Sequence, residues 1–174
     1  MIVNMLRDFI DPGSPMEVPA ARSIIDNIAG EISYAREKGR PVIYLVDAHE
    51  EDEAEFDLWP VHAVKGSQGA QIIDALAPIP GDHVVEKNSY SGFYQTELGS
   101  LLDELEIGEL LLTGVMTNVA ILYTAVGAIM RGIGVVVPQT CSAAMTEQDH
   151  LFSLRQINEV LTNPATRRWK KGEE

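Results

Sequence analysis

The sequence predicts an α/β domain built on a doubly wound, mainly parallel sheet of five to six strands with helices on both faces. One observation behind this is that short apolar runs rich in β-branched residues alternate with longer segments whose apolar residues recur at helical spacing. The other is the length of 174 residues, which suits one domain with a sizeable core. No internal repeat or low-complexity segment interrupts the alternation.

The amino-terminal half is expected to alternate between strands and helices. The run Met-Ile-Val-Asn-Met-Leu predicts a strand at residues 1–6. Isoleucines three or four positions apart predict a helix at 20–38, and a Lys-Gly-Arg sequence suits its C-terminus. The run Pro-Val-Ile-Tyr-Leu-Val-Asp predicts a strand at 41–47, and a helix at roughly 68–77 and the strand His-Val-Val-Glu at 83–86 follow.

The carboxyl-terminal half continues the same alternation. A helix is expected at 95–105, before the strand Glu-Leu-Leu-Leu-Thr at 109–113. An apolar helix at 118–131 leads into the strand Ile-Gly-Val-Val-Val-Pro at 133–138. The last helix, 146–161, opens with Thr-Glu-Gln-Asp, which offers a side-chain N-cap and an acidic first turn.

Charge and composition exclude several functional classes. The chain has 13 Lys and Arg residues and 26 Asp and Glu residues, which gives a net charge of −13. This charge argues against binding to nucleic acids or anionic membranes, because both require a basic protein surface. No apolar run approaches the ~20 residues that span a bilayer, and the start of the chain lacks a signal-peptide layout. Cys141 is the only cysteine, which excludes an intrachain disulfide and suits the cytoplasm. We expect a cytoplasmic protein with a domain at 1–162 and a tail at 163–174.

Polar residues follow several predicted strands, where ligands bind in doubly wound sheets. These positions are Asn4, Asp47, Lys87, residues 114–120 and Gln139. A convergence of these side chains would make this edge of the sheet the ligand-binding edge.

A metal site is one interpretation of Asp47, His49 and His62. Residues i and i+2 of a strand project to the same side, so Asp47 and His49 can converge, and His62 lies thirteen positions after His49. Two imidazoles and a carboxylate form a common ligand set for Zn²⁺, Fe²⁺ or Mn²⁺. On spacing alone, loop histidines hydrogen-bonded near a strand end are the alternative.

Four segments in this order resemble the isochorismatase-like cysteine hydrolases, a family that includes nicotinamidases and N-carbamoylsarcosine amidases. They are Val3-Asn-Met-Leu-Arg-Asp-Phe9, the Asp-x-His and Trp-Pro-x-His motifs just described, Lys87-Asn-Ser-Tyr-Ser-Gly-Phe93, and Gly114-Val-Met-Thr-Asn-Val-Ala-Ile-Leu-Tyr-Thr-Ala125. The resemblance covers roughly residues 1–160 and implies a Rossmann-type, three-layer fold. The family reaction is hydrolysis of a small carboxamide to acid and ammonia.

The resemblance places Asn4, Lys87 and Ala120 at the positions of the family's Asp–Lys–Cys triad. An amide cannot take up a proton as the aspartate does, and a methyl group cannot attack a carbonyl. We therefore expect no covalent thioester route, although the backbone amides of Met116 and Ala120 match an oxyanion hole beside a non-proline cis peptide bond. Cys141 is expected to pack in the core.

The resemblance also implies a ligand set, a substrate contact set and an assembly. Asp47, His49 and His62 would bind a divalent metal (Zn, Fe or Mn) with no organic cofactor, and the ligand would be a small amide or carboxylate. The substrate-binding residues would be Trp59, Tyr90 and Phe93. Family members commonly form homo-oligomers, so a homo-oligomer is expected, whereas nucleic-acid and membrane partners are not. Two further positions depart from the family pattern, which has acidic residues where this chain has Gly127 and Gln139.

Several functions remain open at this level. One interpretation is an amidohydrolase impaired by Asn4 and Ala120, and these two residues are either natural or were introduced to trap substrate. A second is a non-catalytic protein that binds a small ligand and a metal. A metal-bound water or another non-covalent route is a third reading. A role purely in assembly is a fourth. Isochorismatases lack the cysteine but retain the first-strand aspartate, so Asn4 disfavours that activity.

Overall fold

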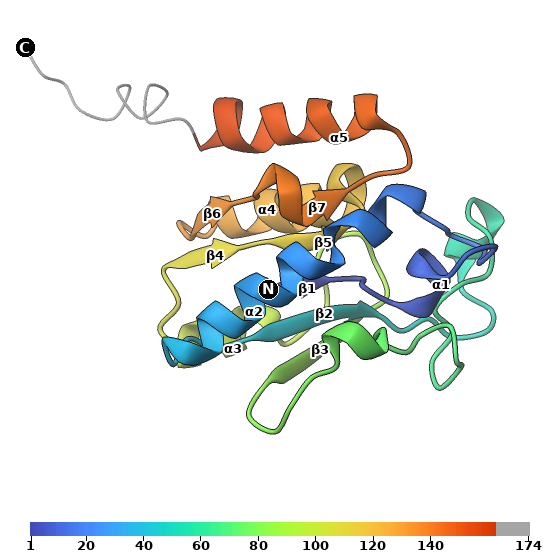
Figure 1. The fold of residues 1–174 in the computed structure, drawn as a ribbon, viewed down its shortest axis with the longest axis horizontal. Coiled ribbons are helices and arrows are strands. Elements are labelled where there is room, and N and C mark those ends of the chain that lie inside the picture. The colour runs from blue at the N-terminus through green and yellow to red at the C-terminus, as the bar shows by residue number, and fades with distance from the viewer. Residues whose placement is uncertain (163–174) are drawn as a thin grey trace, which may run out of the picture.

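The computed structural model describes residues 1–162, and it confirms the predicted α/β fold. Five parallel strands form one sheet in the order β3-β2-β1-β5-β7 (Figure 1). Their bounds are Ile2–Val3 for β1, Ile43–Asp47 for β2, His83–Lys87 for β3, Thr113–Val115 for β5 and Ser142–Ala143 for β7. The first strand lies in the middle, so successive connections wind outward in both directions.

A shorter parallel pair extends the sheet on one side. β4 (Glu109–Leu111) pairs with β6 (Gly134–Val136). The Leu112 amide donates to the Val136 carbonyl at 2.9 Å, which carries the pairing from β4 toward β5. The predicted strands at 109–113 and 133–138 are thus present, the second in a shorter form.

Side chains alternate between the two faces of the sheet. Tyr44 and Val46 of β2 pack with α2 (Ile25–Glu37), whereas Ile43 and Leu45 belong to the opposite cluster. That second cluster contains α3 (Leu98–Glu104), α4 (Leu122–Ile129) and α5 (Glu147–Leu154). Because both faces of β2 are covered, all five of its residues are buried.

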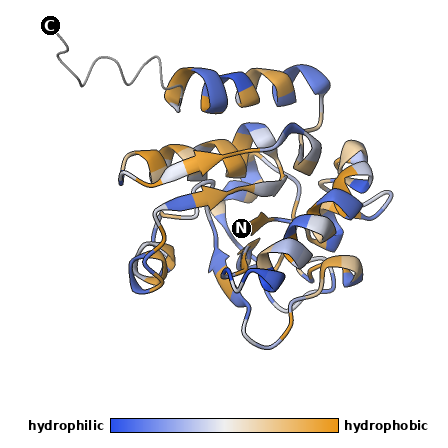
Figure 2. Cartoon of the chain, turned by 60° about the vertical axis from the view of Figure 1, so that its left-hand side comes forward, coloured by the Kyte–Doolittle hydropathy of each residue, from blue (hydrophilic) through white to orange (hydrophobic). Residues whose placement is uncertain are grey.

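The apolar character of α4 follows from its place in this layer. It contacts β6 on one side and the helical turn after α5 on the other. Figure 2 shows α4 as mostly hydrophobic, whereas hydrophilic and hydrophobic residues alternate along α5, which has one side in water. Each large side chain fully buried in such a layer contributes roughly 1.5–3 kcal/mol.

Helix ends match the local signals for the first and last predicted helices. A 3₁₀ turn, η1 (Pro19–Ile24), leads into α2, and Gly39 takes a left-handed φ of +63° just after the end of α2. At the start of α5, the Thr146 hydroxyl accepts a hydrogen bond from the Asp149 amide at 3.1 Å, which confirms the predicted N-cap. A π-helical turn, η6 (Arg155–Leu161), continues α5.

The predicted helix at 68–77 is wrong. The segment contains only the 3₁₀ turn η3 (Asp74–Leu76), because its backbone hydrogen bonds go to the chain after β1. The Arg7 and Asp8 amides each donate to a backbone carbonyl of this segment at 3.0 Å. In the other direction, the Ile73 amide donates to the Met5 carbonyl at 3.0 Å. These bonds hold the segment extended, so it cannot also close helical turns.

Several other bounds differ from the sequence-based expectation. The strand expected at 1–6 ends at Val3, because Asn4 adopts a left-handed φ of +49° that turns the backbone out of the sheet. The helix expected at 118–131 begins as the π-helical turn η4 (Thr117–Ile121). Four short elements were not predicted: the helical turns α1 (Arg7–Ile10), η2 (Ala54–Asp57) and η5 (Gln139–Cys141), and the edge strand β7.

The tail expected at 163–174 lies outside the described residues. Within residues 1–162, no helix combines the length and the hydropathy that a membrane crossing requires.

Candidate active site

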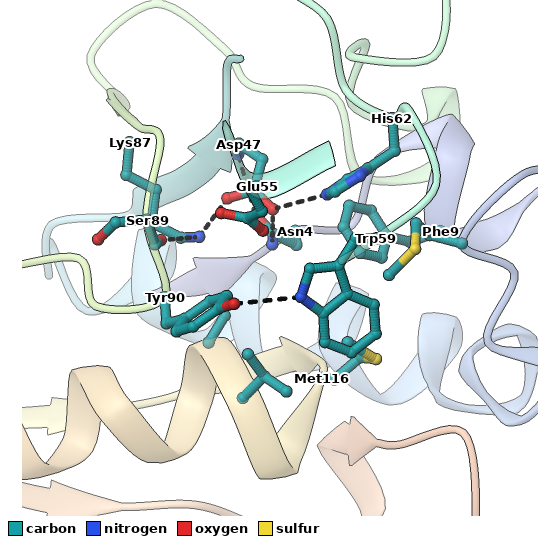
Figure 3. A pocket seen from close by; sticks show the side chains of 13 residues that line it. Asn4, Phe9, Asp47, Glu55, Trp59, His62, Lys87, Ser89, Tyr90 and Met116 are labelled. Atoms are coloured by element: carbon teal, nitrogen blue, oxygen red, sulfur yellow. Dashed lines mark hydrogen bonds and ion pairs between the residues drawn. The ribbon is translucent and has the colours of Figure 1, made fainter. Parts of the chain in front are cut away.

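A narrow pocket opens at the carboxyl ends of the central strands, the edge at which doubly wound sheets bind ligands (Figure 3). Asn4 follows β1, Asp47 and Lys87 are the last residues of β2 and β3, and Ala120 comes from η4. The space between the lining side chains is about 20 Å³, which accommodates a water-sized group. The lining residues are Asn4, Phe9, Met16, Asp47, Glu55, Trp59, His62, Lys87, Ser89, Tyr90, Met116, Val119 and Ala120.

The Asp47 carboxylate is the centre of a buried polar network. Its Oδ1 accepts a hydrogen bond from the Lys87 ammonium, which also donates to the Ser89 carbonyl at 2.8 Å. Its Oδ2 accepts from the Asn4 amide nitrogen at 2.6 Å, and the Asp47 backbone amide returns a bond to Asn4 Oδ1 at 3.0 Å. Lys87 and Asp47 are only 4% and 6% exposed, so each charge depends on the other for its stability in this environment.

Asp47 also belongs to a cluster with His49 and His62. One ligand atom from each residue lies within 4.8 Å of the others, and all three residues are buried. His62 Nδ1 lies 2.7 Å from the Pro60 carbonyl, which can only accept, so Nδ1 carries the proton. In the neutral ring Nε2 then carries the free lone pair, and it lies 4.0 Å from Asp47 Oδ2.

His49 gives an independent reason to regard this cluster as a metal site. Among the described residues, neither of its buried ring nitrogens has a hydrogen-bond partner. Burial lowers the pKa of His49, while the Asp47 charge opposes the shift, so the ring is neutral at neutral pH. A neutral imidazole is the form that binds a metal, and a buried unpaired nitrogen is otherwise unfavourable. The cluster therefore fits a divalent cation.

Asp8, the one acidic residue of the first motif, holds the loop that carries His62. Its Oδ2 accepts the Ala63 amide at 2.8 Å, and an added Cβ at Gly69 would lie 2.0 Å from that oxygen. The Ala63 carbonyl accepts the His49 amide at 3.0 Å. Asp8 thus fixes the two histidine-bearing segments side by side without lining the pocket.

The turn before η4 brings Met116 and Ala120 to the pocket wall. Gly114 has φ +107°, and a Cβ there would lie 2.0 Å from the Val3 carbonyl, so glycine is required where this strand passes β1. The Val115–Met116 peptide bond is cis. Ala120 is buried and presents a methyl group, whereas Cys141 packs in the core beside α2, where burial raises the pKa of its thiol.

Two aromatic side chains cover the pocket. The Trp59 indole N–H donates to the Tyr90 hydroxyl at 3.2 Å, and Figure 3 shows this bond below the Asp47 network. The Tyr90 ring also lies 5.9 Å from that of Tyr123. Phe93, the third residue of the expected substrate contact set, is not among the lining residues. Its ring packs beneath the Arg131 guanidinium, 4.4 Å away.

Glu55 is a pocket residue that was not predicted from the sequence. It comes from η2 and lines the pocket with Asp47 and Lys87. Burial raises the pKa of Glu55, and the Asp47 charge adds to the shift. Because Glu55 follows an acidic, exposed stretch, no apolar period or motif spacing distinguishes it from a solvated residue.

The fold and the site together define a class of protein: an α/β domain of the cysteine-hydrolase architecture, with a lysine and a potential metal cluster at the strand ends. The chain belongs to the isochorismatase family, since the isochorismatase domain matches residues 1–168.

Sequence relatives cover nearly all of the chain. An uncharacterized isochorismatase family protein from Bacillus subtilis is 29% identical over 92% of this chain and 88% of its own length. A probable inactive nicotinamidase from Arabidopsis thaliana is 26% identical over 98% of this chain and 93% of its own.

Solved structures agree with the fold. An isochorismatase-like hydrolase from Alkaliphilus metalliredigens has a TM-score of 0.89 and 30% identity, covering 97% of this chain and 96% of its own. A pyrazinamidase of Pyrococcus horikoshii in complex with zinc has a TM-score of 0.85 and 26% identity, covering 90% and 92%. Relatives and neighbours thus include nicotinamidases and amidases.

Proposed function

We propose that this chain binds a small carboxamide or carboxylate together with a divalent cation and does not hydrolyse it by the covalent thioester route. The observation that supports this most directly is the state of the triad positions. Ala120 offers a methyl group in the pocket wall, and the Asn4 amide is engaged with Asp47. Covalent amidase chemistry needs an activated nucleophile and a base, and these two positions supply neither.

The proposed residue roles follow from the arrangement of the pocket. Asp47, His49 and His62 would hold Zn²⁺, Fe²⁺ or Mn²⁺, which supplies a Lewis-acid contact to the ligand. The zinc in the related pyrazinamidase is consistent with that set. Lys87 would face developing negative charge, and the backbone amides of Met116 and Ala120 would receive the ligand carbonyl oxygen.

The aromatic cover limits which ligand conformations can enter. A space of about 20 Å³ is too small for a pyridine carboxamide, so Trp59 and Tyr90 must separate before such a ligand binds. Phe93 does not line the pocket, so it would shape the pocket entrance indirectly, through its packing on α4. Binding should therefore change the intrinsic fluorescence of Trp59.

We also propose that the chain works as a cytoplasmic homo-oligomer. A single, buried cysteine suits a reducing compartment. Several large apolar side chains are exposed on the described surface, including Leu58 (80%) and Phe152 (60%).

The test of the proposed function is ammonia release from a panel of small amides that includes nicotinamide. The chain is assayed beside its Asn4→Asp/Ala120→Cys revertant, with and without Zn²⁺, Mn²⁺ or Fe²⁺. We expect turnover only in the revertant, while both proteins bind the preferred amide with a change in Trp59 fluorescence. Trp59→Phe controls for the second tryptophan, Trp169.

Turnover by the unmodified chain would contradict this proposal. In that case, loss of turnover in Glu55→Gln would identify Glu55 as the general base, because it is the remaining pocket carboxylate that could take a proton from water. An acyl adduct found by mass spectrometry on the unmodified chain would overturn the absence of covalent chemistry directly.

A further inference from the structure

We propose that Asn4 and Lys87 set the cation affinity of the Asp47–His49–His62 cluster, by holding the only carboxylate of the cluster in an ion pair that an incoming cation must displace. This inference rests on the proposed cation-binding function. It concerns a property of this particular chain, the strength with which it holds the ion.

Both oxygens of the Asp47 carboxylate are already engaged. Lys87 donates to Oδ1, and Asn4 donates to Oδ2 at 2.6 Å, the oxygen that faces His62 Nε2. A metal ion needs a lone pair of this carboxylate, because Asp47 is the one acidic residue of the cluster and the other two ligands are imidazoles. The ion therefore competes with two donors for the one anionic ligand of the set.

The geometry gives Lys87 a single carboxylate partner among the described residues. Its ammonium is paired with Asp47 and donates otherwise to the neutral Ser89 carbonyl. The side chain at position 4 touches Asp47, but as an amide it contributes no charge. The charges of Asp47 and Lys87 therefore cancel. A divalent cation that takes the Asp47 carboxylate leaves the Lys87 ammonium without its anionic partner, and Glu55 is the other acidic residue of the pocket lining.

Asn4 is fixed in this position by its backbone. Its amide N–H donates to the Leu45 carbonyl at 2.9 Å, and its φ of +49° is one that asparagine tolerates better than most residues. An aspartate has almost the same shape and also tolerates this region. Asn4→Asp would therefore place a second carboxylate against that of Asp47. Two carboxylates so close repel each other, and a cation bound between or beside them relieves that repulsion.

The experiment measures Co²⁺ binding by calorimetry and by the visible absorption of the bound ion, with Zn²⁺ competition, on the purified full chain. The variants are Asn4→Asp, which adds a negative charge, and Lys87→Met, which removes the ammonium but keeps the side-chain length. Asn27→Asp is the matched control, because it makes the same chemical change at an exposed amide. His49→Ala removes one ligand of the cluster.

We expect Asn4→Asp and Lys87→Met each to tighten Co²⁺ binding by roughly tenfold or more, the effect of one unit charge a few ångströms away in a partly solvated site. Asn27→Asp should match the unmodified chain within about twofold, since surface charges are screened, and His49→Ala should lose binding. If Lys87→Met fails to fold because it leaves Asp47 buried and unpaired, Asn4→Asp carries the test alone.

The contrary outcomes separate this inference from the function on which it rests. Equal affinities for the unmodified chain and Asn4→Asp, both abolished by His49→Ala, would overturn the inference and leave the cation site standing. Weaker binding in Asn4→Asp or in a folded Lys87→Met would also overturn it. Absence of binding in the unmodified chain and in both variants would overturn the inference and the proposed cation site together.

Discussion

The absence of a side chain at Gly127 leaves room on α4 for the ring of Phe93. A Cβ at this position would lie 2.7 Å from Cδ2 of Phe93 and 3.3 Å from the Ser91 hydroxyl. The other face of the Phe93 ring lies under Arg131. A larger side chain at position 127 would therefore displace Phe93.

This packing leads to a prediction for Gly127→Ala. Alanine raises helix propensity by ~1 kcal/mol, but the methyl group would displace the Phe93 ring, an overpacking cost of about 1–3 kcal/mol. We expect a net loss in the free energy of unfolding, measured by denaturant titration. Gly30→Ala in α2 is the control, because nothing lies within 4 Å of its added Cβ.

Gly30→Ala should stabilise the protein by up to ~1 kcal/mol. Equal stabilisation by the two substitutions would show that Phe93 does not occupy the space beside Gly127. Phe93→Leu combined with Gly127→Ala should recover part of the loss, since the smaller side chain makes room.

At the level of elements, α5 is joined to the turn that carries Ala120 through one polar contact. His150 Nδ1 lies 2.9 Å from the hydroxyl of Thr117, the fully buried first residue of η4. Burial lowers the pKa of His150, while a hydrogen bond with the Gln139 carbonyl and the Glu147 charge oppose the shift. Protonation of His150 therefore works against the docked position of α5.

The pH dependence of stability follows from this shift. A histidine whose pKa is lower in the folded than in the unfolded state makes the unfolded state bind more protons, so stability is lost as pH falls below about 6.5. We expect His150→Gln to lose less stability than the unmodified chain between pH 7.5 and pH 5.5, measured by chemical denaturation. An NMR titration that places the pKa of His150 at or above 6.5 would contradict this.

Elements with strong local signals were predictable from the sequence. Apolar β-branched runs identified β2 and β3, and Thr146 identified the start of α5. The extended segment around Gly69 was not predictable, because its conformation depends on hydrogen bonds to residues 5–8, more than sixty positions away. Asn4 likewise ends β1 through a backbone conformation that no apolar pattern encodes.

At the level of the whole molecule, the parallel sheet explains why distant motifs could be assigned to one site. Asp47 and Lys87 are paired across β2 and β3, so their proximity follows from strand order alone. What the sequence could not provide is side-chain direction. The engagement of Asn4 with Asp47, the approach of Glu55 and the position of Phe93 outside the pocket all depend on rotamers and loop packing.

The exposed apolar side chains predict self-assembly. Because large apolar side chains are exposed, we expect sedimentation equilibrium to give a mass that is a multiple of the 19.1 kDa of one chain. Two substitutions would locate the interface, Leu58→Lys near the pocket mouth and Phe152→Lys on α5. The substitution that lies in the interface should shift the protein toward the monomer. A single species of one chain's mass at every concentration would rule out the homo-oligomer.

The burial of Cys141 has a practical consequence for probing the pocket. As the sole thiol, buried beside α2 with a raised pKa, it should react slowly with thiol reagents. Ala120→Cys would therefore place a sulfur at the pocket wall on an almost silent background. The labelling rate of that sulfur, followed with a chromogenic disulfide, would report how often the Trp59–Tyr90 cover opens.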